Sequence, residues 1–176
     1  MKRVLLWLLA IVLLGGAVFI TPIIWFKPWT PDQFYAKVFF TFALRHPMLL
    51  TQLGVLENTP FRWYADDIDD MSPVAEQSDA KLLDENLKML RSYDRSHMTR
   101  TAALSADVLD WFLDDQQRGN AKFMFYNYPV NQMFGAQNGL PTFMITTQPL
   151  KRERDARAYV ARTAKIGRAI ARRSTD

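Results

Sequence analysis

The chain has 176 residues, a formal net charge of +4 and no cysteine. A chain of this length predicts one domain, and the lack of cysteine excludes disulfides, thiolate zinc sites and a cysteine nucleophile. The charge is uneven, because residues 62–118 hold 13 acidic and 7 basic residues whereas residues 151–173 hold 9 basic and 2 acidic residues.

An apolar run from Val4 to Phe26 follows Lys2 and Arg3. As a helix its 23 residues would extend over about 34 Å, which exceeds a hydrocarbon core of about 30 Å. The positive charge before the run predicts a cytoplasmic N-terminus. We therefore expect a membrane anchor over residues 1–29 that meets the lipid bilayer through residues 4–26. The expected location is the inner (cytoplasmic) membrane, crossed once, with one helical domain, residues 30–176, in the periplasm or outside the cell.

A cleaved signal peptide is the alternative for the N-terminal run. Val4–Leu14 would be its apolar region, and residues 15–17 offer the small side chains that cleavage needs. The apolar run continues to Phe26, which favours the anchor. Both interpretations place the remaining chain outside the cytoplasm.

The spacing of apolar residues after position 29 predicts helices. They are expected over residues 31–44, 48–53, 73–93, 104–117 and 151–173. Thr30 and Gln33 form a capping-box pattern with Pro31 at the first helical position, and Gly119 and Asn120 indicate the end of the fourth helix.

Residues 123–147 show no long helical period and contain Pro129 and Pro141. The predicted fold is therefore all-α: an N-terminal transmembrane helix, then an irregular bundle of about five helices with one long aromatic and polar loop segment. Residues 126–132 are the most distinctive part of that loop. They have a functional interpretation, a substrate-facing or domain-docking loop, and a structural one, in which amides cap helices and aromatic rings complete the core.

No catalytic, cofactor-binding or metal-ligating residue can be assigned from the sequence. His46 and His97 are the only histidines, and no HExxH pattern exists for a helical zinc pair. The acidic residues within 66–70 lack the spacing and central glycine of a calcium loop. Residues 135–139 lack the serine or lysine of a nucleophile elbow or phosphate loop.

The string Tyr128-Pro-Val-Asn-Gln-Met-Phe-Gly135, followed by Leu140-Pro-Thr-Phe143, resembles the bacterial family named domain of unknown function 885. The similarity continues at Asp155-Ala-Arg-Ala-Tyr159-Val-Ala-Arg162. The resemblance implies a largely helical, often exported protein of the zinc-peptidase type. It also implies that the histidine-glutamate metal motif lies in a later part of the family domain, so zinc is implied only for a full-length relative.

Three functional hypotheses follow. The first is the N-terminal helical region of a membrane-anchored, zinc-peptidase-like protein, inactive alone, whose partner is a C-terminal catalytic portion. The second is a membrane-tethered helical interaction or scaffold module without catalysis. The third uses the basic residues of 151–173 for lipid or nucleic-acid contact. A solvated helix face explains those residues as well, so no nucleic-acid partner is expected.

Overall fold

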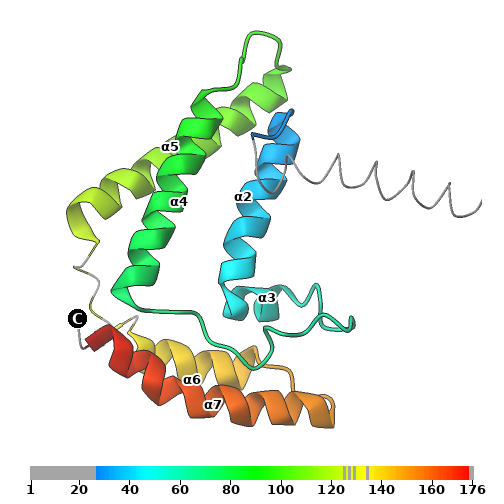
Figure 1. Ribbon diagram of the computed structural model, residues 1–176, viewed down its shortest axis with the longest axis vertical. Coiled ribbons are helices and arrows are strands. Elements are labelled where there is room, and N and C mark those ends of the chain that lie inside the picture. Colours follow the sequence, from blue (N-terminus) through cyan, green and yellow to red (C-terminus); the bar gives the residue numbers. More distant parts are fainter. Residues whose placement is uncertain (1–26, 125, 127, 129, 134, 175–176) are drawn as a thin grey trace, which may run out of the picture.

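The computed structural model describes residues 27–124, 126, 128, 130–133 and 135–174. This part of the chain contains six α-helices and no strand (Figure 1). They are α2 (Pro31–Arg45), α3 (Pro47–Leu53), α4 (Pro73–Arg91), α5 (Arg100–Phe123), α6 (Ala136–Thr146) and α7 (Glu153–Ser174). The expected all-α class is therefore confirmed for the described residues.

The predicted architecture needs correction at its N-terminus. Within the described ranges, no helix is long and apolar enough to cross a membrane. Each of these helices is amphipathic or short, and α2 itself carries Asp32, Lys37 and Arg45. The expected transmembrane helix over residues 4–26 lies outside the described residues.

The predicted number of helices was also wrong, because the expected loop over residues 123–147 contains α6. Pro141 lies inside this helix, where it removes one backbone donor. Leu140 and Met144, four residues apart, are both buried, and their burial outweighs the local preference of proline. Six described helices thus replace the expected bundle of about five.

α5 also runs further than predicted, because Gly119 does not end it. A glycine ends a helix when it adopts a left-handed conformation. Gly54 does so after α3, with φ of 65° and its N–H bonded to the Leu50 carbonyl at 3.2 Å. Among the described glycines, Gly54 alone has positive φ. Gly119 therefore continues the helix.

The predicted capping box at the start of α2 is confirmed. The Gln33 backbone N–H donates to Thr30 Oγ1 at 3.3 Å, and the Thr30 N–H donates to Gln33 Oε1 at 3.4 Å. These two bonds satisfy donors that a helix start leaves without partners. They fix the point at which the chain enters the bundle.

The main core lies where α2 meets the α4–α5 hairpin. Its buried residues are Phe34, Leu87, Leu90, Ala106 and Leu113. Tyr93 packs on Phe34 with ring centroids 5.7 Å apart, and its hydroxyl donates to the Pro28 carbonyl at 2.6 Å. Burial raises the pKa of Tyr93 to about 12. This contact fixes the chain before α2 against the end of α4.

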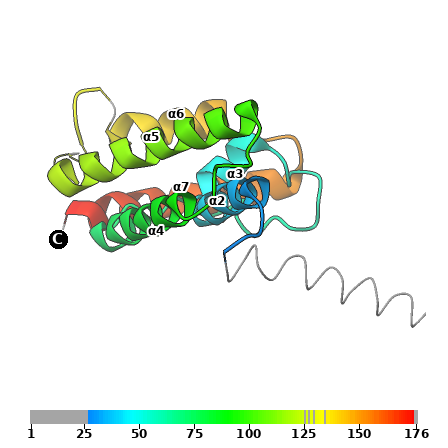
Figure 2. The same cartoon turned by 90° about the horizontal axis from the view of Figure 1, so that it is seen from above.

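The helices α6 and α7 form a second pair across the other end of the molecule (Figure 1). Seen from above, α7 runs below α6 and α5 (Figure 2). A smaller apolar cluster of Ala43, Leu50 and Tyr64 lies between the two regions. The fold therefore has two regions, one built on α2, α4 and α5 and one built on α3, α6, α7 and residues 54–72.

Candidate functional site

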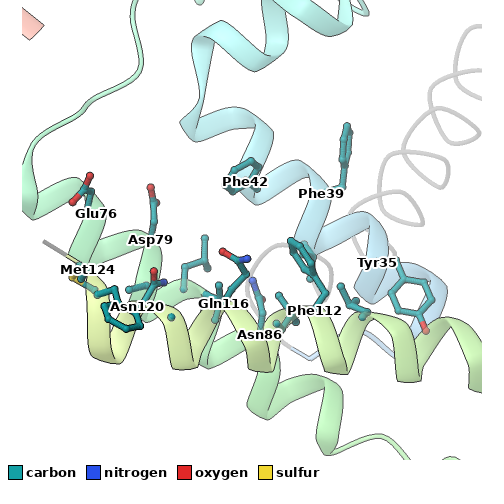
Figure 3. Close-up of a pocket in the computed structure, with 18 of the residues that line it drawn as sticks. Tyr35, Phe39, Phe42, Glu76, Asp79, Asn86, Phe112, Gln116, Asn120 and Met124 are labelled. Atoms are coloured by element: carbon teal, nitrogen blue, oxygen red, sulfur yellow. The ribbon is translucent and has the colours of Figure 1, made fainter. Parts of the chain in front are cut away.

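Three helices present one face each to an open groove of about 910 Å³ (Figure 3). The lining residues include Tyr35, Val38, Phe39 and Phe42 of α2, Asp79, Leu83 and Asn86 of α4, and Ser105, Leu109, Phe112, Gln116 and Phe123 of α5. They recur three or four residues apart on each helix, so each helix contributes one stripe. The groove therefore combines three stripes from the region that also holds the main core.

The walls of this groove are apolar and accessible to solvent. Phe39, Phe42 and Phe112 are 47%, 47% and 48% exposed, whereas Leu113, next to Phe112 in sequence, is 5% exposed. Exposed apolar patches of this kind mark binding sites or interfaces. The same helix therefore has one face in the core and an adjoining face without cover from the described chain.

One buried polar group in the groove lacks a partner. The Tyr35 hydroxyl is buried without a hydrogen-bond partner among the described atoms. Asn86, which is 6% exposed, also lines the groove. Burial raises the pKa of Tyr35, so its hydroxyl stays protonated. Since an unpaired buried polar group costs about 1–3 kcal/mol, this hydroxyl favours an occupant that supplies a partner.

One end of the groove is acidic. Glu76 and Asp79 lie at this end in Figure 3, and Tyr35 lies at the opposite end. Asp79 accepts a hydrogen bond from Arg45 Nε at 2.7 Å. The described lining residues include these two carboxylates and no cation. The groove thus offers apolar contact along its length and two carboxylates at one end, of which Asp79 is already paired with Arg45.

A different arrangement surrounds Arg162, which is 0% exposed on α7. Its Nε donates to the Asp67 carbonyl at 2.7 Å, its Nη2 donates to the Tyr64 carbonyl at 2.8 Å and to Thr51 Oγ1 at 3.0 Å, and its Nη1 donates to Gln148 Oε1. Burial lowers the pKa of Arg162. This one side chain joins α7 to α3 and to the segment between α3 and α4.

Asp155 is the second buried charge of α7, with 1% exposure. It accepts hydrogen bonds from Arg62 Nη1 at 2.7 Å and from the backbone N–H groups of Lys151 at 3.2 Å and Arg152 at 3.0 Å. Burial alone would raise the pKa of Asp155, but these donors and the Arg62 charge hold it below its ordinary value. Asp155 therefore caps α7 and binds the Arg62 segment to it.

The two histidines lie in different places. His46 joins α2 to α3, with Nδ1 at 2.7 Å from the Phe42 carbonyl oxygen and Nε2 at 3.6 Å from Asp79 Oδ2. His97 is exposed in the turn between α4 and α5. Among the described residues, no three His, Asp or Glu side chains gather where they could hold a metal ion. That the whole chain holds no metal stays a prediction.

The acidic cluster of residues 66–70 is divided among neighbouring elements. Asp69 Oδ1 accepts from the Met48 N–H at 2.8 Å and so caps α3, while Asp70 Oδ1 accepts from the Ser72 N–H at 3.0 Å before α4. Burial raises the pKa of Asp69. These contacts give Asp69 and Asp70 structural roles at the starts of α3 and α4.

Several basic residues of 151–173 meet acidic partners within the chain. Lys165 Nζ lies 3.5 Å from Asp66 Oδ2 and 3.4 Å from Asp67 Oδ1, and Lys151 Nζ lies 3.2 Å from Glu57 Oε1. The spacing of Tyr159, Thr163, Ile166 and Ile170 in the sequence predicts an apolar stripe on the last helix, and this prediction was wrong in part. Asp155, Ala158 and Arg162 form its buried face, while Tyr159 is half-buried and Thr163 is exposed.

The described residues of the distinctive segment 126–132 lie largely on the surface. Tyr126 and Tyr128 are exposed, so these rings do not complete the core. Asn131 holds the turn, since its Oδ1 accepts from the Met133 N–H at 3.0 Å. Gly135 follows as the cap of α6, where a Cβ would lie 2.5 Å from the Asn131 backbone nitrogen. The loop before α6 therefore requires glycine at this position.

Neither the groove nor the buried network was predicted from the sequence. The spacing of Phe34, Val38 and Phe42, and that of Leu109, Phe112 and Leu113, predicts core-facing stripes, so the exposure of Phe42 and Phe112 was not expected. Arg162 and Asp155 carried one available signal, since both belong to the string that resembles the family. Their spacing of seven residues also places them on one face of a helix.

The model of a family described as "Bacterial protein of unknown function (DUF885)" matches residues 47–175. The match includes the string from Tyr128 to Phe143 and the buried residues of α7. No curated protein and no solved structure shows a significant match to the chain.

Proposed function

Because the chain belongs to the bacterial DUF885 family, we propose that its helices form a non-catalytic portion of a zinc-peptidase-like family domain. In this proposal the portion packs against the one that carries the metal. The family membership confirms the predicted resemblance. The peptidase-like activity comes from what that resemblance implies.

The groove between α2, α4 and α5 is the observation that carries the proposal. Its aromatic walls are about half exposed, and it contains the unpaired Tyr35 hydroxyl. A protein surface gains free energy when such apolar area is buried, at about 25 cal/mol per Å². The groove is therefore suited to packing against a further part of a larger helical domain.

The buried network of Arg162 and Asp155 also supports the proposal, because these charged groups are bonded within the chain. Every bond that Arg162 donates ends on a group within this chain. The role of these residues in the proposal is to hold α7 against α3 and against the segment between α3 and α4.

The test compares the 176-residue chain with the same chain continued by the later portion of a full-length family member. Bound zinc is measured by elemental mass spectrometry, and peptide hydrolysis is followed with a mixed library of short peptides. We expect zinc and hydrolysis in the continued chain only. Stoichiometric zinc with hydrolysis in the 176-residue chain alone would contradict its non-catalytic role.

The absence of both zinc and hydrolysis from the continued chain would contradict the peptidase-like activity. A helical interaction module without catalysis would then explain the groove better. A Gly54→Ala variant of the continued chain serves as a folding control, because it strains the positive-φ turn after α3 and alters no group that the proposal assigns to binding.

A further inference from the structure

The helix α5 has a second apolar surface, on the side that faces away from the core. Leu104, Val108 and Trp111 are 62%, 58% and 66% exposed. They follow one another at intervals of four and three residues, so they lie along one side of the helix. Ala106 and Leu113 are buried on the opposite side. Leu104, Val108 and Trp111 are the outer stripe of α5.

The outer stripe is separate from the groove between α2, α4 and α5. In Figure 2, α2 and α4 lie together on one side of α5, and the groove between the three helices is lined by Leu109 and Gln116 of α5. None of the three residues of the outer stripe lines that groove. They line a shallow hollow of about 500 Å³ instead. The two apolar surfaces of α5 can therefore meet different partners.

One charged residue lies beyond each end of the outer stripe. Arg100 precedes Leu104 by four residues and Asp115 follows Trp111 by four residues, so both lie on the side of the helix that carries the stripe. Neither charged residue takes part in an ion pair among the described residues. The other acidic residues of α5 are paired within the chain, and they are Asp107 with Arg95, Asp110 with Arg91 and Arg95, and Asp114 with Arg91 and Arg118.

These two charges cannot meet within one copy of the chain, because Arg100 and Asp115 are about 22 Å apart along the helix axis. They can meet across a twofold axis near Val108 that pairs two α5 helices in opposite directions. Arg100 of each copy then faces Asp115 of the other copy. In the same register Leu104 faces Trp111 of the other copy, and the two Val108 side chains meet beside the axis. The outer stripe is therefore complementary to a second copy of itself in charge and in apolar surface.

A lipid surface suits the outer stripe less well. Helices that lie on membranes carry lysine and arginine beside their apolar face, because these cations are attracted to anionic lipids. Beside the outer stripe are the carboxylates of Asp107, Asp114 and Asp115, which anionic lipids would repel. A second copy supplies a cation for Asp115, whereas an anionic bilayer does not.

We propose that two copies of this chain associate through the outer stripe of α5, with the two helices antiparallel. A typical stable interface buries about 800 Å² on each partner, and one stripe of three side chains supplies less than that. The dimer therefore dissociates reversibly on dilution. The inference does not depend on the proposed function, because the groove lies on another side of α5 and is left open in the dimer.

Introduced cysteines test which residues meet, since the chain contains no cysteine. After oxidation of the full chain, Val108→Cys should give a disulfide-linked dimer, because its two copies lie beside the axis within the short reach of a disulfide. Leu104→Cys should give little dimer by itself, since its two copies are about 10 Å apart along the axis. A mixture of Leu104→Cys and Trp111→Cys, with tags of different size, should give the mixed dimer. Non-reducing gel electrophoresis measures the yields.

Val160→Cys on α7 is the control for random collision, because Val160 is exposed and lies away from α5. Equal yields at positions 108 and 160 would overturn the inference. A dimer of Leu104→Cys as abundant as that of Val108→Cys would overturn the antiparallel arrangement. No disulfide at position 108, together with weaker binding of Trp111→Ser to phosphatidylglycerol vesicles, would assign the stripe to lipid and overturn the proposal.

Two charge reversals test the ends of the stripe. Arg100→Asp and Asp115→Arg each place like charges at both symmetric contacts and should weaken the dimer about tenfold. An equimolar mixture of the two variants brings opposite charges together at both contacts, so it should dimerise as the wild type does. Sedimentation velocity at several protein concentrations, in one mild detergent, measures the dimer fraction.

Arg157→Asp on α7 is the matched control, because it reverses an exposed arginine outside the stripe and should leave the dimer fraction unchanged. Restoration by mixing separates the contact from misfolding, since mixing two misfolded variants restores nothing. Failure of the mixture to dimerise, or an unchanged dimer fraction in both single variants, would overturn the pairing of Arg100 with Asp115.

Discussion

Arg162 and Phe112 lie in two regions of this molecule that differ in which side chains they bury. Arg162 is charged and 0% exposed, whereas Phe112 is aromatic and 48% exposed. Around Arg162, the four hydrogen bonds of the guanidinium end on groups of the same chain, while Arg62 Nε and Gln148 Nε2 are buried without partners among the described atoms. Around Phe112, an apolar groove is open to solvent and the Tyr35 hydroxyl lacks a partner among the described atoms. The first region buries charged side chains against its own backbone and side chains, and the second leaves an apolar face open, as binding surfaces do.

The variant with the largest expected effect on stability is Arg162→Met. The change leaves two backbone carbonyls and the Thr51 and Gln148 side chains without their buried donor. We expect the free energy of unfolding to fall by about 3–5 kcal/mol. Urea denaturation followed by circular dichroism measures it.

Arg157→Met is the matched control for that variant. Arg157 lies on the same helix and pairs with Glu153 at 2.6 Å, but both side chains are about 80% exposed. Exposed pairs of this kind contribute about 0–1 kcal/mol. An equal loss of unfolding free energy in the two variants would mean that the buried contacts of Arg162 stabilise the fold no more than an exposed ion pair does.

A second test uses two neighbouring residues of α5. Leu113→Ala removes a side chain with 5% exposure and should cost about 2–4 kcal/mol through the cavity it leaves. Phe112→Ala removes a half-exposed ring and should cost less than about 1 kcal/mol in the 176-residue chain. Thermal or urea unfolding measures both. A larger loss for Phe112→Ala would show that the groove face is already part of the core.

The double variant Thr30→Ala with Gln33→Ala removes the capping box of α2 and should cost about 1–2 kcal/mol. Since α2 supplies one wall of the groove, this change weakens the groove region only. Amide hydrogen exchange should show faster exchange in α2 and unchanged exchange in α7. Equal acceleration in both helices would mean that the two regions unfold as one unit.

The smallest expected effect is a pH dependence in the Arg162 region. The pKa of Asp155 is held below its ordinary value, so the unfolded chain binds a proton at this residue more readily than the folded chain. The stabilisation from Asp155 is therefore complete above pH of about 4 and is lost as the pH falls through the lowered pKa. Urea midpoints between pH 6 and pH 3 measure this slope.

Asp155→Asn should remove this dependence of the unfolding free energy on pH. It should also lower the free energy of unfolding at neutral pH. Asp69 contributes with the opposite sign, because burial raises its pKa. The difference between the wild-type and Asp155→Asn profiles isolates the Asp155 contribution. Identical profiles would contradict the assignment.

Local signals in the sequence were sufficient for several elements. The start of α2 follows from Thr30 and Gln33, whose capping bonds involve neighbouring residues only. The end of α3 follows from Gly54 for the same reason. Such features depend on contacts within one turn of the chain, and a single sequence contains them in full.

Tertiary contacts determined the elements that the sequence did not predict. Pro141 signals a loop locally, but the burial of Leu140 and Met144 keeps α6 helical. On α7 the apolar spacing indicated a stripe through Tyr159, whereas the buried face follows Asp155 and Arg162. Hydrophobicity patterns cannot identify a charged residue as buried, because its partners lie far away in the sequence.

The groove was not predictable for a related reason. The spacing of Phe34, Val38 and Phe42 correctly indicated an apolar face on α2. That face is divided in the structure, since Phe34 is fully buried and Phe42 is 47% exposed. Periodicity shows that a face is apolar, but the arrangement of neighbouring helices decides which part of it they cover.

The contacts of Arg162 have a consequence for the order in which the chain folds. They join residue 162 to Thr51, Tyr64 and Asp67, at separations of 111, 98 and 95 residues. The α4–α5 hairpin needs only neighbouring segments, so it can form early during synthesis. At a synthesis rate of about 5–20 residues per second, Arg162 is added to the chain roughly 5–20 seconds after the segment that follows α3. During that interval its carbonyls are bonded to water, and the arrival of α7 completes this half of the molecule last.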